Sequence, residues 1–169
     1  MTLIIAAGCI VLLLAVVLVA LFRKVFAPAR AEDVDPVWLH EFDVETYRPM
    51  ERLLDPDDYE FLEKQDGYRP GMARELRKKR QRILRQYLQG LGRDFDRLHR
   101  TARLLVLYAP SDQPELVREL LKQSTVFWGS MAIVRLRLAV PLLGAVDFKK
   151  LLGTTQWMRG QVAVYLPAR

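Results

Sequence analysis

The chain has 169 residues, of which 51% are hydrophobic and 27% charged, and its net charge is +6. Its single cysteine excludes an internal disulfide, and about 140 residues remain after the first apolar run, which is the size of one domain. Because that run holds twenty uncharged residues, the rest of the chain is ordinary in apolar content and rich in charge.

The apolar run opens the chain and predicts a membrane anchor. As an α-helix, residues 3–22 would measure roughly 30 Å, the thickness of the hydrocarbon core of a bilayer. A signal peptide would place basic residues before the run, but Arg23, Lys24 and Arg30 follow it. Because cations favour the cytoplasmic side, we expect a single-pass anchor over residues 1–26 in the inner (plasma) membrane, with the N-terminus outside and the C-terminal domain cytoplasmic. The Arg-rich, Lys-poor composition favours a bacterial source.

Two alternatives to a retained anchor are disfavoured. Residues 27–31 contain small residues at the spacing of a signal cleavage site, but positive charge precedes them. Residues 6–9 resemble a lipidation box ending at Cys9, but only eight residues precede this cysteine and thirteen apolar residues follow it. We therefore interpret Cys9 as a small apolar residue of the anchor.

Residues 27–54 are interpreted as a linker with short helical turns, because prolines interrupt any longer period. The sequence Asp55-Pro56-Asp57-Asp58 then predicts a helix from residue 56 to about 65, with an aspartate cap, a proline at the first position and acids in the first turn. Gly67 is expected to end it. The same acids lack the alternating ligands and the distal glutamate of a calcium loop, so no metal site is predicted.

A long helix is predicted between Pro70 and Pro110. Its apolar seam recurs at spacings of four and three: Leu84, Leu88, Leu91, Phe95, Leu98, Ala102 and Leu105. A continuous helix over residues 71–109 would measure roughly 58 Å. Gly90 and Gly92 predict a bend or a close helix contact within it.

A second seam of the same spacing follows a short turn. Its members are Val117, Leu120, Ser124, Phe127, Met131, Val134 and Leu138. Asp112 and Glu115 have the spacing of a capping box, which predicts the start of this helix. Two seams joined by a short turn predict an antiparallel hairpin, although the first seam could also pair between chains in a homo-oligomer. A last helix, capped by Asp147 and running from residue 148 to about 165, would close a third side.

The predicted fold is therefore all-α with three parts. A single transmembrane helix (1–26) and a linker (27–54) precede a cytosolic helical domain (55–169). This domain is expected to be built around a long antiparallel, coiled-coil-like helical hairpin with a C-terminal helix.

Positive charge is concentrated on the long helix. Residues 36–69 carry 4 basic and 10 acidic residues, whereas residues 70–105 carry 11 and 3. We name its candidate binding residues the basic stripe: Arg74, Arg77, Lys78, Lys79, Arg80, Arg82, Arg85, Arg93, Arg97 and Arg100. The stripe could pair with the acidic segment 41–66, contact anionic lipid headgroups, or contact an acidic protein partner. Nucleic acid is the least favoured partner, because no aromatic residues alternate with the cations and no nucleic-acid motif accompanies them.

An enzymatic role has little support in the sequence. The two histidines are His40 and His99, and we expect Asp96 and His99 to form a surface pair, since a helical metal site needs several such pairs. No phosphate loop, nucleophile elbow or cysteine–histidine set is present, and no cofactor is predicted. The sequence favours a non-enzymatic docking or scaffold protein. A membrane-tethered enzyme, with a site assembled from distant residues, remains the alternative.

Overall fold

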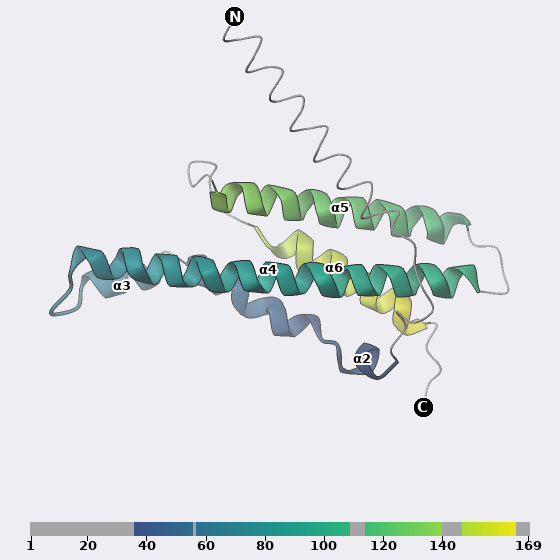
Figure 1. The fold of residues 1–169 in the computed structure, drawn as a ribbon, viewed down its shortest axis with the longest axis horizontal. Helices are drawn as coiled ribbons and strands as arrows, with labels where there is room; N and C mark the ends of the chain where they lie inside the picture. The colour runs from purple at the N-terminus through teal and green to yellow at the C-terminus, as the bar shows by residue number, and fades with distance from the viewer. Residues whose placement is uncertain (1–35, 56, 109–113, 140–146, 165–169) are drawn as a thin grey trace, which may run out of the picture.

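The part of the chain that the structure describes consists of helices. The computed structural model describes residues 36–55, 57–108, 114–139 and 147–164. Its elements are α2 (Pro36–Glu41), the 3-10 helix η2 (Val44–Leu54), α3 (Asp57–Glu63), α4 (Pro70–Leu107), α5 (Pro114–Ala139) and α6 (Lys149–Val164). Figure 1 shows α4 through the middle of the molecule, with α5 on one side and η2 and α2 on the other. The all-α prediction is therefore confirmed for the described residues.

The predicted anchor, residues 1–26, lies outside the described residues. Among the helices that are described, none combines the length and the hydrophobicity that a membrane crossing requires.

Helices α4 and α5 lie side by side and run in opposite directions. Near the middle of α4, the rings of Phe95 and Phe127 stack with their centroids 3.7 Å apart. Leu88 of α4 shares a hollow with Leu138 near the end of α5, whereas residues at the end of α4 share a second hollow with residues at the start of α5. Residue numbers thus rise along one helix where they fall along the other, as expected for a hairpin.

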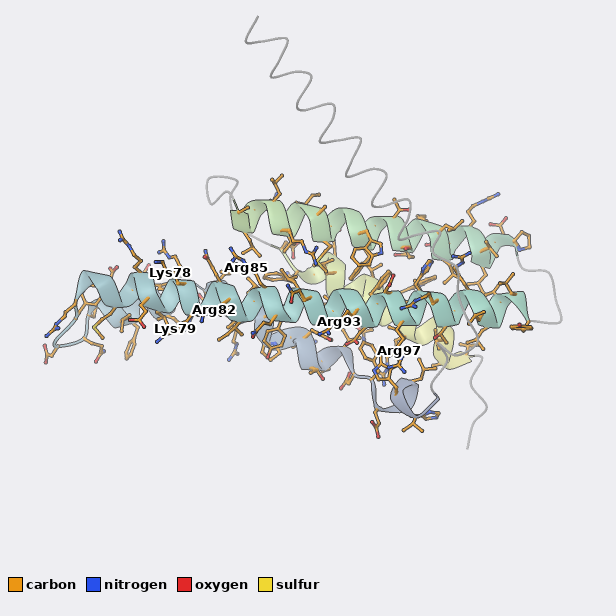
Figure 2. All side chains as sticks on the ribbon, viewed as in Figure 1. Lys78, Lys79, Arg82, Arg85, Arg93 and Arg97 are labelled. Carbon is orange, nitrogen blue, oxygen red and sulfur yellow. The ribbon has the colours of Figure 1, made fainter. Side chains whose placement is uncertain are left out.

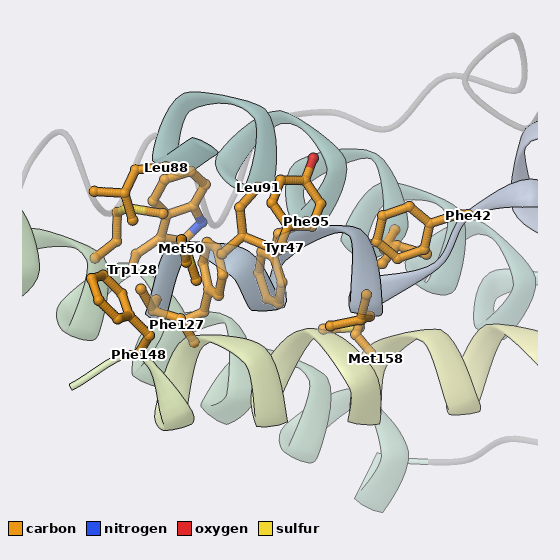
Figure 3. Packing of buried hydrophobic residues seen from close by; sticks show 14 of the residues in the cluster. Phe42, Tyr47, Met50, Leu88, Leu91, Phe95, Phe127, Trp128, Phe148 and Met158 are labelled. Atoms are coloured by element: carbon orange, nitrogen blue, oxygen red, sulfur yellow. The ribbon is translucent and has the colours of Figure 1, made fainter. Parts of the chain in front are cut away.

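Both predicted seams lie in the core of the domain except at their ends: Val117 is 44% exposed, and Leu105 and Leu138 are half-buried (Figure 3). The α4 seam from Leu84 to Leu98 is at most 1% exposed. Helix α6 packs against both α4 and α5 and closes the third side of the core. The buried side chains that α5 and α6 add are Leu120, Phe127, Trp128, Met131, Val134, Leu151, Met158 and Val162. The α4 seam thus packs within one chain.

Residues 36–54, which we predicted to be part of a linker, contribute to this core. Val44, Tyr47 and Met50 are buried and recur every three residues. A 3-10 helix has three residues per turn, so this spacing places all three side chains on one face of η2. Leu39 and Phe42 are buried beside them. The short helical turns that we predicted are present, and they cover α4 and α6.

Two of the three glycines of α4, Gly90 and Gly92, mark close contacts with aromatic rings. A Cβ atom at Gly90 would lie 3.1 Å from the hydroxyl oxygen of Tyr47, and one at Gly92 would lie 3.5 Å from Trp128. The Tyr47 hydroxyl donates a hydrogen bond to the carboxylate of Asp94. Burial of the hydroxyl and this carboxylate both raise the pKa of Tyr47. The predicted close helix contact is confirmed at both glycines.

Local capping sets the starts of two helices. The amide of Asp57 donates to Asp55 Oδ1 at 3.2 Å, and the amide of Lys149 donates to Asp147 Oδ1 at 2.9 Å. Gly67 has φ +84° in the turn between α3 and α4, a conformation that favours glycine. Both predicted caps are confirmed. Helix α3 ends at Glu63, four residues before Gly67, so Gly67 belongs to the turn that follows the helix and does not end it. The predicted capping box, which starts at Asp112, falls partly outside the described residues.

Candidate anion-binding surface on α4

Helix α4 extends beyond the end of its partner α5. It has 38 residues, or roughly 57 Å, whereas α5 has 26. Ala139, the last residue of α5, lines a hollow together with Arg85. The residues of α4 that precede Arg85 therefore lie past the end of α5, and Figure 2 shows Lys78, Lys79 and Arg82 on this part of the helix.

Seven residues of the basic stripe are exposed on this helix, and five of them share one side of it: Arg74, Lys78, Arg82, Arg85 and Arg93. Their spacings of four, four, three and eight place them on one side of α4, over an axial length of about 28 Å. Within the described part of the chain, none of the five has a carboxylate within ion-pair distance. They form a band of positive charge that is not paired with any carboxylate of the described residues.

The neighbouring stripe residues are compensated by α3 or by α4 itself. Arg80 Nη2 lies 2.7 Å from Asp58 Oδ2, and the guanidinium groups of Arg77 and Arg80 lie 5.2 and 5.3 Å from the centre of the Tyr59 ring. Lys79 forms an ion pair with Glu75 one turn away on α4, which lowers the pKa of that carboxyl group. Pairing with the acidic segment therefore involves one flank of the stripe.

The C-terminal stripe residues have structural partners. The guanidinium of Arg97 lies 4.2 Å from the centre of the Trp38 ring, which places α2 against α4. Arg100 Nη2 lies 3.6 Å from Asp96 Oδ2. Both arginines are half-buried. Sequence reasoning missed Trp38 and Tyr59, because no periodic signal connects them to arginines that lie 18 to 59 positions further along the chain.

His99 is a core residue, and the prediction of a surface pair with Asp96 is wrong. The histidine is 2% exposed, and its ring is nearly parallel to that of Phe95, with the centroids 6.4 Å apart. Burial, together with the charges of Arg103 and Arg100, lowers the pKa of His99 to about 4. The residue follows the seam position Leu98, and α6 and η2 pack on α4 in addition to α5, so the buried part of α4 is wider than one seam.

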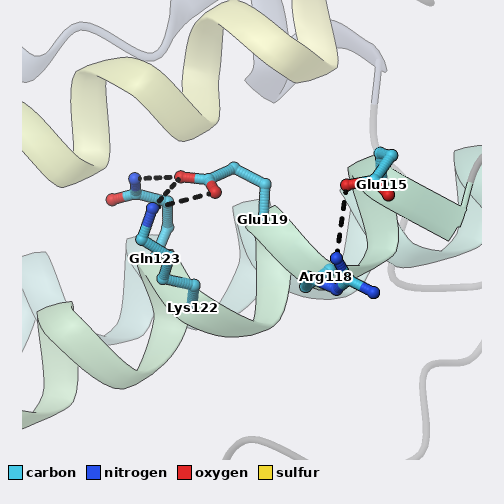
Figure 4. A network of polar contacts seen from close by, with 5 residues as sticks. All are labelled: Glu115, Arg118, Glu119, Lys122 and Gln123. Atoms are coloured by element: carbon cyan, nitrogen blue, oxygen red, sulfur yellow. Dashed lines mark hydrogen bonds and ion pairs between the residues drawn. The ribbon is translucent and has the colours of Figure 1, made fainter.

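Two exposed cations in the first half of α5, Arg118 and Lys122, differ from the five unpaired stripe cations because each has a carboxylate partner on its own helix (Figure 4). Lys122 Nζ lies 3.1 Å from Glu119 Oε2, and Arg118 Nη1 lies 3.6 Å from Glu115 Oε2. Gln123 Nε2 also donates to Glu119, at 2.7 Å. Such exposed pairs add little to stability, but they neutralise the charge of this part of α5.

A metal-dependent site has no basis in the described residues, since no group of three or more His, Cys, Asp or Glu side chains there is placed to hold an ion. No known protein family, no curated protein and no solved structure matches the chain. The functional proposal therefore rests on the charge and geometry of the surface on α4.

Proposed function

We propose that this protein is a single-pass, membrane-anchored docking or scaffold protein whose basic stripe contacts anionic lipid headgroups on the cytoplasmic side. The observation that carries the proposal is the set of five exposed stripe cations without a carboxylate partner in the described residues. A basic residue near an anionic leaflet contributes about 1 kcal/mol, so five would contribute roughly 5 kcal/mol at low salt.

The proposed anchor has the reach that this contact needs. Helix α2 begins at Pro36 and lies against α4 through Trp38 and Arg97. Nine residues separate Phe26 from Pro36, so the ten Cα–Cα steps between these two residues can span about 35 Å when extended. An anchor ending at Phe26 would therefore allow α4 to lie along the membrane surface. It would also hold the domain at a high local concentration there, which favours lipid over a diffusing acidic protein.

A fluorescent label on α4 tests the contact in the full chain. Cys9, the single cysteine, is replaced by serine, and Gln86, exposed between Arg82 and Arg93, is replaced by cysteine and labelled with an environment-sensitive fluorophore. The protein is reconstituted into nanodiscs of phosphatidylcholine alone or mixed with phosphatidylglycerol. We expect a blue shift of the emission in the anionic discs only, and its reversal by raised salt. The same label at Gln156→Cys, on the exposed side of α6, reports whether the shift is confined to α4.

Charge reversal identifies the residues that make the contact. The triple variant Lys78→Glu, Lys79→Glu, Arg82→Glu should abolish the shift while leaving the helical circular dichroism unchanged, because all three side chains are exposed. A control variant makes the same change of charge on α5 and α6: Arg118→Glu, Lys122→Glu and Lys149→Glu. It should keep the shift. Equal emission in neutral and anionic discs would contradict the proposal and favour an acidic protein partner instead.

A further inference from the structure

A hollow of about 310 Å³ lies where the end of α5 meets α4. Its lining residues are Arg85, Leu88 and Gln89 from α4 and Arg135, Leu138 and Ala139 from α5. Its volume is at the lower end of the range for small-molecule pockets. The hollow is continuous with the basic stripe, since Arg85 belongs to both (Figure 2).

The charges of this hollow are of one sign. Arg85 and Arg135 come from different helices and line the same space, and no acidic residue lines it with them. Neither arginine has a carboxylate partner among the described residues, and none of the described lining residues is acidic. Two like charges in one hollow repel each other, and an anion bound between them would remove this cost. The guanidinium fork matches the oxygens of a phosphate group better than any other side chain does.

Apart from Gln89, the remaining lining residues are apolar, and they distinguish among phosphate compounds. Leu88 is 1% exposed and forms a floor to the hollow, with Leu138 and Ala139 beside it. Inorganic phosphate would leave Leu138 and Ala139, which are not fully buried, in contact with water. A phosphate that carries hydrocarbon would cover them and gain the free energy of apolar burial.

We propose that this hollow binds the phosphate headgroup of one anionic membrane phospholipid. The phosphate lies between Arg85 and Arg135, and the glycerol and the first part of an acyl chain lie against Leu88 and Leu138. The proposal rests on the proposed function, because it adds one specific lipid contact to a domain that is docked by its charge. It differs from that docking in requiring the shape of the guanidinium group as well as its charge.

Arginine-to-lysine substitutions separate shape from charge. The full chain, purified in a nonionic detergent, is titrated with dioleoylphosphatidylglycerol, and the population with one bound lipid is measured by native mass spectrometry. The variant Arg85→Lys, Arg135→Lys keeps the net charge but loses the fork geometry, and we expect at least a ten-fold loss of affinity. The control variant Arg52→Lys, Arg118→Lys makes the same change at exposed arginines of η2 and α5 that lie outside both the hollow and the basic stripe. It should bind lipid as the wild type does.

Two further probes identify the chemistry of the bound group. Oleate carries a hydrocarbon chain without phosphate, and inorganic phosphate carries the anion without hydrocarbon. Neither should displace the phospholipid at concentrations that saturate the wild type with phosphatidylglycerol. Displacement by either probe, or equal lipid affinity in the two lysine variants, would overturn the proposal.

The outcome is independent of the nanodisc experiment. Because the Arg85→Lys, Arg135→Lys variant keeps its charge, its fluorophore on α4 should still shift in anionic discs. If every charge-conserving variant shows the emission shift and also binds phosphatidylglycerol with the affinity of the wild type, the headgroup site is refuted and the docking function is not. The absence of any shift in the wild type would refute the docking function.

Discussion

The contact between Tyr47 and Gly90 predicts that the effect of Gly90→Ala on stability depends on one atom, the Tyr47 hydroxyl oxygen. With this atom present the substitution should destabilise the protein, and without it the substitution should stabilise it. Glycine inside a helix is about 1 kcal/mol less favourable than alanine, so Gly90→Ala would ordinarily stabilise α4. At this position, however, the new Cβ atom would lie 3.1 Å from the Tyr47 hydroxyl oxygen and 3.4 Å from its Cε1 atom. The ring cannot retreat freely, since its hydroxyl is bound to Asp94 and its neighbour Tyr87 packs edge-on at 6.2 Å.

The two opposing effects have comparable magnitudes. Displacing the hydroxyl weakens a hydrogen bond to a charged group, which contributes about 1.5–3 kcal/mol. We therefore expect Gly90→Ala alone to destabilise the protein by about 1 kcal/mol. In the Tyr47→Phe background the closest atom is absent and the next lies at an ordinary contact distance, so the same change should stabilise the protein by up to about 1 kcal/mol. The expected coupling energy is about 2 kcal/mol.

A double-mutant cycle measures this coupling. The wild type, the two single variants and the double variant are unfolded in urea, with helical circular dichroism as the signal, and their free energies of unfolding are compared. The reasoning requires that Gly90→Ala changes sign between the two backgrounds. If it stabilises both by the same amount, then the Tyr47 ring moves aside at no cost and η2 is not fixed on α4 by this contact.

Three further predictions concern the core and the contact of α2. The pKa of His99 is about 4 in the folded protein and about 6.5 in the unfolded chain, so the unfolded chain binds a proton first as the pH falls. The free energy of unfolding should therefore be unaffected by His99 above pH 6.5 and should fall by roughly 3 kcal/mol as the pH decreases to 4. Urea titrations at a series of pH values measure this, and the His99→Leu variant should lose this part of the pH dependence. Phe127→Ala removes a fully buried ring that stacks on Phe95 and should lower the free energy of unfolding by about 3–5 kcal/mol. Thermal unfolding should show a lower midpoint, and an unchanged midpoint would contradict the position of Phe127 in the core. Arg97→Met keeps the side-chain stem but removes the charge over Trp38, so hydrogen exchange in α2 should accelerate by a factor equivalent to about 1 kcal/mol, with no change in α5.

The long helices and their starts follow from the sequence by itself. The bond that holds each helical residue links it to a residue four positions away, so local spacing is enough to place α4 and α5 and to identify their buried seams. The caps at Asp55 and Asp147 each join residues two positions apart, so the sequence predicts them equally well. The ten residues of the basic stripe were predicted from the same local information.

Only the tertiary structure decided which of those cations are compensated. Asp58 and Tyr59 meet Arg80, and Trp38 meets Arg97, across separations that no local period encodes. Tertiary structure also decided the place of η2, because its three-residue spacing is too short a signal to predict that Tyr47 covers Gly90. It decided the burial of His99 as well, because several helices pack around α4. Hydrogen bonding along the backbone is local and fixes the elements, whereas burial and charge pairing depend on how those elements dock against one another.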